Sequence, residues 1–344
     1  MNNKAQHELT FDIMRKSNTI LKPVCKLIIL LICRLIYCLI PAKFCSENKS
    51  CFFADLCTII GIHFVATQYY KKYLEKHPNN EKILKKLASS HCKVKEYNIA
   101  LDIYLSLQKL SDDFEVPYQI AKIYEKQGRY QEAIEKYNET LLLNPCFVCA
   151  YYNWANILDE MDCHDEAISK YRQALALSPN NSEILIGIGL AHEAKGEYKE
   201  ACKNFKKAIM LNPNLAEAYF AWGTVLEKIK DYNGAIEKYE KAIDIDPHYS
   251  DVYARWGEVH YLLGDFDSAI NKLKIAIQID PEQSLALYDL ACVYVKVGQI
   301  SEAFKYFRKA LKIDSTIIEE IENNANLTTL KNTTQYKSLY KLAS

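Results

Sequence analysis

The chain has 344 residues, and its 43 basic side chains balance its 43 acidic ones, so its formal net charge is zero. This balance provides no basic footprint for a nucleic-acid backbone, and we expect no nucleic-acid partner. The 12 cysteines follow no disulfide framework of the kind found in small secreted domains, so the composition predicts a reducing, cytoplasmic compartment.

The first predicted element is an apolar helix over residues 24–40, which read VCKLIILLICRLIYCLI. Its uninterrupted part runs from Leu27 to Ile40 and includes Arg34, whereas a bilayer span takes about 20 apolar residues. A central arginine costs roughly 2.5–3.5 kcal/mol on insertion scales, and surrounding leucines and isoleucines each offset about 0.3–0.6 kcal/mol, so insertion is marginal. Three interpretations remain open: a packed N-terminal helix, which we favour, a membrane-associated helix, and a cleaved signal.

A regular recurrence of alanine organises the rest of the chain. The intervals are about 34 residues, a length typical of stacked supersecondary units. The alanines that mark the period are Ala66, Ala100, Ala133, Ala167, Ala201, Ala235, Ala269 and Ala303. Prolines recur at the ends of the copies, from Pro78 to Pro281, where they stop a helix and force the chain to reverse.

Each copy contains two segments with the spacing of amphipathic helices. In the copy that opens at Ala216, apolar residues follow this spacing first around Trp222 and again around Tyr239. Small residues at a fixed place in both segments, here Gly223 and Ala235, allow the two helix backbones to approach closely. A large ring or a leucine follows each repeat alanine by four residues and fills the seam between copies, where its burial contributes about 1.5–3 kcal/mol.

These residue types and their spacing resemble the tetratricopeptide repeat. The pattern has Trp or Tyr, Leu or Trp, Gly or Ala, and Tyr in the first segment, followed by Ala, Phe or Tyr, Ala and Pro in the second. Four consecutive copies match it almost in full, and they open at Val148, Ser182, Ala216 and Ser250. The resemblance implies an all-α fold, a right-handed superhelical solenoid of antiparallel helix pairs.

The resemblance divides the chain into four parts. Residues 1–46 form the N-terminal segment with the apolar helix, which caps the array or associates with a membrane. Residues 47–113 hold two degenerate repeats, and residues 114–317 hold six repeats. Residues 318–344 provide a C-terminal capping helix and a tail, since terminal repeats require a cover for their exposed face.

In the family that this chain resembles, the first helix of each repeat lines a concave groove that binds an extended or helical peptide. The partner is therefore expected to be a protein or a peptide. Carried over to this sequence, the resemblance predicts a partner-binding groove formed by Glu115, Tyr118, Glu125, Tyr152, Asn156, Asp159, Glu183, Glu193, Glu217, Phe220, Glu227, Asp251, Glu258, Tyr261 and Tyr288.

Acidic residues at the ends of the first helices indicate which kind of partner to expect. Acids in a first turn favour the helix dipole by a few tenths of a kcal/mol and would occur in any case. Late in a helix the dipole disfavours acids, yet four helices carry one there: Glu125, Asp159, Glu193 and Glu227. This excess predicts an acidic groove with aromatic side chains, which attracts a basic or aromatic segment through charge steering and cation–π contacts.

No constellation of side chains in the sequence predicts catalysis. Cys146, Cys149, Cys163 and His164 have zinc-ligand types, but Cys149 opens a predicted helix and Cys163 follows its end, about 20 Å away. We therefore expect no metal, no cofactor, no small-molecule substrate and no enzyme activity. Three histidines share one repeat position, which is a packing slot between helices: His91, His192 and His260.

Three functions remain open. We favour a non-enzymatic interaction scaffold that binds its partner in the concave groove. The first alternative is a membrane-tethered assembly factor, which requires the segment from Leu27 to Ile40 to insert. The second is a non-catalytic relative of sugar transferases, because similar repeat arrays precede the transferase domain in some proteins and only a short tail follows residue 317 here.

Overall fold

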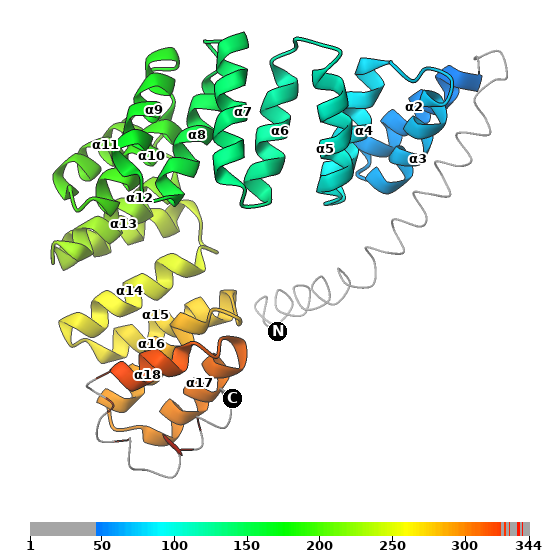
Figure 1. The fold of residues 1–344 in the computed structure, drawn as a ribbon. Coiled ribbons are helices and arrows are strands. Elements are labelled where there is room, and N and C mark those ends of the chain that lie inside the picture. The colour runs from blue at the N-terminus through cyan, green and yellow to red at the C-terminus, as the bar shows by residue number, and fades with distance from the viewer. Residues whose placement is uncertain (1–45, 325–326, 328–329, 331–335, 338, 340–344) are drawn as a thin grey trace, which may run out of the picture. The chain divides into compact units, whose positions relative to one another are not determined.

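The computed structural model describes residues 46–324, 327, 330, 336–337 and 339 (Figure 1). The chain divides into two compact units, one up to Ala150 and one from Tyr151, and this boundary falls inside α8 (Val148–Glu160). The apolar segment at residues 24–40 lies outside the described residues. Among the helices that are described, none is long and apolar enough to cross a membrane.

Three helix pairs build the described part of the first unit. They are α2 (Ser46–Ile59) with α3 (His63–Leu74), α4 (Glu81–Lys93) with α5 (Tyr97–Gln108), and α6 (Glu115–Lys126) with α7 (Tyr130–Leu143). The two helices of a pair pack against each other, and α3 packs on α4 as α5 packs on α6. Residues 47–113 therefore contain two helix pairs, each leaning on its neighbour.

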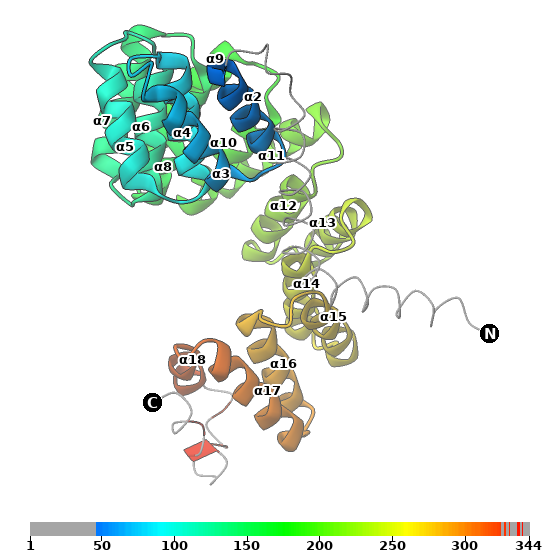
Figure 2. The same ribbon diagram turned by 90° about the vertical axis from the view of Figure 1, so that its right-hand side faces the viewer.

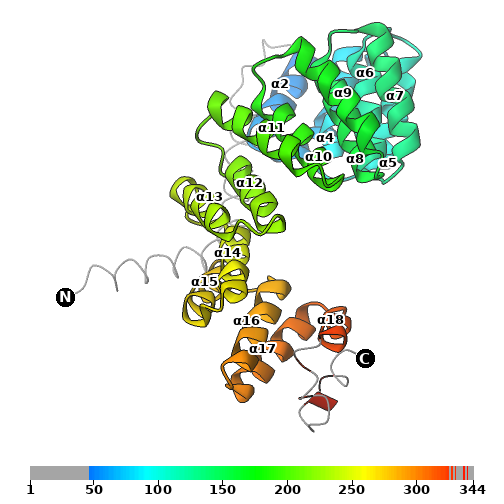
Figure 3. The same ribbon diagram turned by 90° about the vertical axis from the view of Figure 1, so that its left-hand side faces the viewer.

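The second unit continues the same pairing after α8. Its helices are α9 (His164–Leu177), α10 (Ser182–Ala194), α11 (Tyr198–Leu211), α12 (Ala216–Lys228), α13 (Tyr232–Ile245), α14 (Ser250–Leu263), α15 (Phe266–Ile279), α16 (Ser284–Lys296), α17 (Ile300–Ile313) and α18 (Ile317–Asn323). Figures 2 and 3 show the pairs α12–α13, α14–α15 and α16–α17 side by side. The short α18 packs against α16 and α17, and its capping role stays a prediction.

A left-handed residue follows the first helix of each pair and turns the chain into the second. At Gly264, with φ of 80°, the backbone N–H of Asp265 donates to the carbonyl of His260 over 2.9 Å, which is the hydrogen bond that ends many helices. Lys230 occupies the equivalent turn with φ of 65°. A Cβ makes this conformation unfavourable, so the turn is set by the packing of the two helices and does not depend on glycine alone.

Glycines in the first helices let large rings of the second helices approach the backbone. A Cβ on Gly223 would lie 2.4 Å from Cε1 of Tyr239 in the same repeat, and a Cβ on Gly187 would lie 2.7 Å from Cζ of Tyr171 in the preceding one. Both tyrosines are buried. The sequence pattern predicts that the small residues admit the neighbouring helix backbone and that the rings fill the seam between copies. The structure places the rings directly over the glycines, within a copy at Gly223 and between copies at Gly187.

Candidate functional site

Two of the predicted groove carboxylates bind a tyrosine of the second helix in their own repeat. In the first unit, Tyr137 Oη donates a 2.8 Å hydrogen bond to Glu125 Oε2. In the second unit, Tyr239 Oη donates one of the same length to Glu227 Oε2. Burial raises the pKa of both Tyr239 and Glu227. The late carboxylate therefore links the end of the first helix to the middle of the second.

The other two late carboxylates also have internal partners. Asp159 Oδ1 lies 2.6 Å from His164 Nδ1 at the start of α9. Glu193 Oε1 lies 3.0 Å from Lys228 Nζ of the following repeat, and its side chain is only 12% exposed. These partners give a structural reason for acids late in a helix. The excess of such acids no longer indicates a partner by itself.

Three first-turn carboxylates of the second unit are open to a partner. Glu183 in α10, Glu217 in α12 and Asp251 in α14 are all exposed. Asp251 Oδ1 accepts a 2.6 Å hydrogen bond from Gln283 Nε2. The side chains of Glu183 and Glu217 have no hydrogen-bond or ion-pair partner among the residues that the structure describes, so their charge is available at the surface.

Tyrosine rings lie beside these exposed carboxylates. Burial raises the pKa of Tyr152, and the charges of Glu183 and Glu217 raise it further. Burial likewise raises the pKa of Tyr249, with contributions from Glu217 and Asp251. Glu217 contributes to the pKa of both rings, and Phe220, which is three residues after Glu217 in α12, contacts Tyr249 over 5.2 Å between centroids.

The rings predicted for the groove pack on rings of the second helices. The Phe220 centroid lies 6.1 Å from that of Tyr239 and 5.2 Å from that of Tyr249. The Tyr288 centroid lies 5.9 Å from that of Phe307. Phe220 and Tyr288 are half-buried, so each is held rigidly on one side and keeps part of its surface open.

The same contact between rings recurs in two earlier repeats. Tyr152 lies 5.7 Å from Tyr171 between centroids, and Tyr171 Oη donates a 2.5 Å hydrogen bond to Asn156 Oδ1. In the first unit, Tyr118 lies 5.9 Å from Tyr137. Asn156 therefore takes the role that Glu227 has two repeats later, as the acceptor for a buried tyrosine.

At the end of the second unit, predicted groove residues meet at a small cavity. Glu258, Tyr261 and Tyr288 line it, and its volume is about 130 Å³. Asp289, which is not among the residues predicted from the sequence, also lines this cavity. The repeat register would have pointed to it, because Asp289 occupies the repeat position that Arg255 has one copy earlier. A charged residue at this position is therefore next to the predicted groove residues in both copies.

The hollow in the first unit has a different charge. Its volume is about 570 Å³, and the charged side chains that line it are Asp55, Lys85, Lys86, Lys93 and Glu115. Lys86 Nζ lies 2.6 Å from Asp55 Oδ2, and Lys85 pairs with Asp113. Glu115 thus lies among lysines of α4, and an acidic surface does not extend through this unit. The repeat pattern specifies small and apolar positions only, so it did not predict a role for these lysines.

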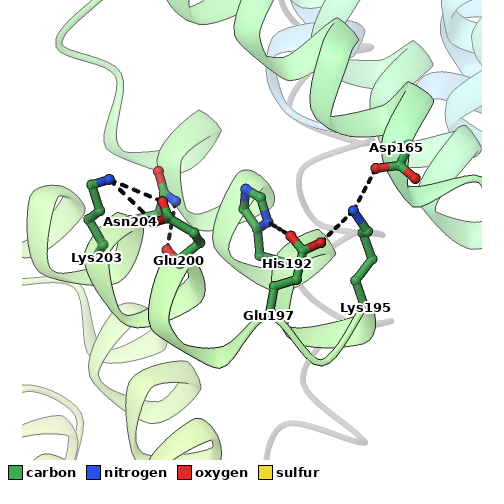
Figure 4. Close-up of polar contacts among 7 residues, drawn as sticks. All are labelled: Asp165, His192, Lys195, Glu197, Glu200, Lys203 and Asn204. Atoms are coloured by element: carbon green, nitrogen blue, oxygen red, sulfur yellow. Dashed lines mark hydrogen bonds and ion pairs between the residues drawn. The ribbon is translucent and has the colours of Figure 1, made fainter.

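The shared histidine position ties the end of each first helix to the start of the second. Figure 4 shows His192 Nδ1 2.6 Å from Glu197 Oε2, with Lys195 Nζ 2.7 Å from the other oxygen of that carboxylate. His91 Nδ1 lies 2.5 Å from Glu96 Oε2, also five residues later, whereas His260 Nδ1 lies 3.4 Å from Asp265 and makes no hydrogen bond among the described residues. His91 and His192 are buried, as expected of a packing slot, whereas His260 is half-buried.

Comparison with known families identifies the repeat. A profile described as "TPR repeat" matches residues 164–196, 194–230, 228–264 and 257–298, and one described as "Tetratricopeptide repeat" matches residues 118–145 and 284–317. Together these matches span more than half of the chain. The chain belongs to the tetratricopeptide repeat family. The predicted all-α fold of tandem helix pairs is confirmed by this membership and by the helices described above.

Several solved structures resemble this tetratricopeptide array. A crystal structure of MamA is 30% identical and covers 48% of this chain and 96% of that chain, with a TM-score of 0.43. YrrB, described as a TPR protein with an unusual peptide-binding site, is 21% identical over 57% of this chain and 98% of that chain, with a TM-score of 0.43. The Cut9–Hcn1 hetero-tetramer of APC/C has a TM-score of 0.55 at 18% identity, covering 88% of this chain and 57% of that chain, and shares the fold. No curated protein matches the sequence significantly.

Family membership sets the general function. Tetratricopeptide arrays bind peptides or proteins, so this chain is a protein-interaction scaffold. The fold is typically non-catalytic.

Proposed function

We propose that the second unit binds a basic and aromatic segment of a partner protein on its acidic first-helix face. This face is defined by Tyr152, Glu183, Glu217, Phe220, Tyr249 and Asp251. The observation that carries the proposal is the pair of exposed carboxylates at Glu183 and Glu217, one repeat apart, which have no partner among the described residues. Their regular spacing suits an extended segment that carries cations at intervals.

Two basic residues of the first helices, Lys228 in α12 and Arg255 in α14, are already paired. Lys228 Nζ lies 3.0 Å from Glu193, and Arg255 Nη1 lies 2.8 Å from Glu258 Oε2. The exposed acids are thus not neutralised from within the unit. A surface of one charge sign steers an oppositely charged segment towards it and rejects acidic segments.

The aromatic residues of the face add contact area at low cost in entropy. Tyr152 and Phe220 are half-buried and packed on second-helix rings, so binding immobilises little further motion. A lysine or arginine over such a ring gains about 0.5–2 kcal/mol. Carboxylates and rings together therefore favour a segment that mixes basic and aromatic side chains.

Charge reversal at the two exposed acids tests this proposal. The probe is a fluorescein-labelled dodecapeptide in which lysine and tyrosine alternate with serine and glycine, here called the basic peptide. We expect Glu183→Lys with Glu217→Lys to weaken its binding to the full chain at least about tenfold, since each lost attraction is worth about 1 kcal/mol in water and becomes a repulsion. Fluorescence anisotropy gives the affinities, and circular dichroism checks that the helices remain.

The matched control carries the same change of net charge on second helices, as Glu200→Lys with Glu240→Lys. Both residues are exposed, on α11 and α13, and this variant should bind nearly as well as the original chain. Equal losses in both double variants, or no loss in either, would reject the proposed face. Glu193 and Glu227 are unsuitable for this test, because their internal partners make their reversal a change of stability.

A further inference from the structure

The small cavity at the end of the second unit combines aromatic walls with carboxylates. Its volume is about 130 Å³, and it is lined by residues of α14, α15 and α16 together with Asn324. Tyr261 and Tyr288 contribute rings, and Glu258 and Asp289 contribute carboxylates. Tyr288 is fixed in place, because Asn324 Nδ2 donates a 2.9 Å hydrogen bond to its Oη.

The size of the cavity limits what can occupy it. Sites for cofactors and drug-sized ligands measure about 300–1,000 Å³, whereas a water molecule takes up about 30 Å³ of the liquid. A volume of about 130 Å³ therefore holds a few water molecules or one extended side chain. It does not hold a small-molecule substrate.

Negative charge around the cavity is not balanced. Arg255 Nη1 lies 2.8 Å from Glu258 Oε2 and 3.8 Å from Glu227 Oε1, so one guanidinium pairs with two carboxylates. Asp289 has no hydrogen-bond or ion-pair partner among the described residues. The group that would complete the cavity is a cation.

We propose that this cavity binds one lysine side chain of the partner segment. The stem lies between the rings of Tyr261 and Tyr288, and the ammonium group reaches Asp289 and Glu258. A lysine has a slender stem and a compact head with three donors, whereas the planar guanidinium of arginine needs a wider, forked site. The inference rests on the proposed function, because it names an anchor for the same basic segment.

Binding of an ammonium group here is coupled to a proton. Burial, followed by the charge of Glu258, raises the pKa of Asp289 to about 7. The other groups that face it are Arg255 on α14, Glu227 on α12 and Glu320 on α18, with Tyr261, Tyr288 and Cys292 at the cavity. A bound cation favours the ionised carboxylate, so below pH 7 binding releases the proton of Asp289 to solvent. The affinity therefore rises about tenfold between pH 6 and pH 8.

The free molecule n-butylammonium, which reproduces the lysine side chain, tests the site in the full chain. Methyl resonances of Leu262 and Val293, which line the cavity, report binding there. The comparison is 1-butanol at the same concentration and ionic strength. We expect saturable shifts with n-butylammonium, about tenfold tighter at pH 8 than at pH 6, and no saturable shifts with 1-butanol.

Asp289→Asn should weaken n-butylammonium binding at pH 8 about tenfold and abolish the pH dependence. The matched control is Asp267→Asn, an exposed acid on α15 outside the cavity, which should change neither. Equal binding by the original chain and Asp289→Asn at pH 8 would overturn the inference.

A second variant keeps the test decisive if Asp289→Asn fails to fold. Leu262 is 50% exposed and forms part of the cavity wall, so Leu262→Trp should block entry and remove the Val293 shifts, and retained shifts would count against the site. The basic peptide separates this inference from the proposed function. If Glu183→Lys with Glu217→Lys weakens binding of the basic peptide but Asp289→Asn leaves n-butylammonium binding unchanged, the face is supported and the cavity is not. If only Asp289→Asn weakens binding of n-butylammonium, the cavity alone is supported.

Discussion

Tyr239→Ala lowers the free energy of unfolding of the second unit by about 3–5 kcal/mol, the range for removing a large buried ring. Tyr239 is completely buried, its ring leaves no room for a Cβ on Gly223, and it belongs to the same core cluster as Val252 and Trp256. Its loss opens a cavity between two repeats and leaves Glu227 without its hydrogen-bond donor. Urea unfolding followed by tryptophan fluorescence measures the effect, since all three tryptophans lie in the second unit.

Tyr239→Phe is the matched control because it keeps the ring and removes only the hydroxyl. We expect a smaller loss, about 1–2 kcal/mol, for an orphaned acceptor at Glu227. Equal losses for the two variants would mean that the ring contributes little. If Tyr239→Phe left the free energy of unfolding unchanged, Glu227 would not stabilise the fold. Its unfavourable place late in the helix would then again indicate a partner.

Asp289→Asn stabilises the protein at pH 8 by about 1–3 kcal/mol and has little effect at pH 4. The pKa of Asp289 rises from 3.8 to about 7 on folding, chiefly because of burial. A carboxyl whose pKa is raised in the folded state favours folding at low pH, and this contribution is lost as the pH rises from about 4 to 7. At pH 8 the ionised carboxylate therefore destabilises the fold, and an uncharged amide of the same shape removes that penalty.

Urea unfolding at the two pH values measures this difference. Asp267→Asn, at an exposed position, should show no comparable gain. A variant at Asp289 that is less stable at pH 8 than the original chain would show that the carboxylate has a favourable partner and that the cavity needs no cation. A gain in stability combined with a loss of ammonium binding is typical of a functional site, where stability is given up for recognition.

The arrangement of helices was predictable because it depends on a pattern that repeats. Proline at Pro247 ends α13 nearby at Ile245, and the next helix begins at Ser250. The close approach at Gly223 was also predictable, since only a residue without a side chain fits against the ring of Tyr239. Such features follow from local steric limits, and these can be read from a single sequence.

The roles of the acids were harder to predict. The sequence marks Glu227 as unfavourable for the helix dipole, but it does not show that Tyr239 Oη reaches it from the second helix. That bond depends on the phase and tilt of two packed helices. Asp289 was missed for a related reason, since its surroundings come from α12, α14 and α18, which lie in different copies. The lysines of α4 were visible as a run of charge, but their convergence on one hollow was not.

Hydrogen exchange of the full chain, measured by mass spectrometry with and without the basic peptide, tests the central claim most directly. The account predicts added protection in α8, α10, α12 and α14, with α11, α13 and α2 to α7 unchanged. Protection confined to the second helices, or to α4 and α6 around the lysine-lined hollow, would contradict it.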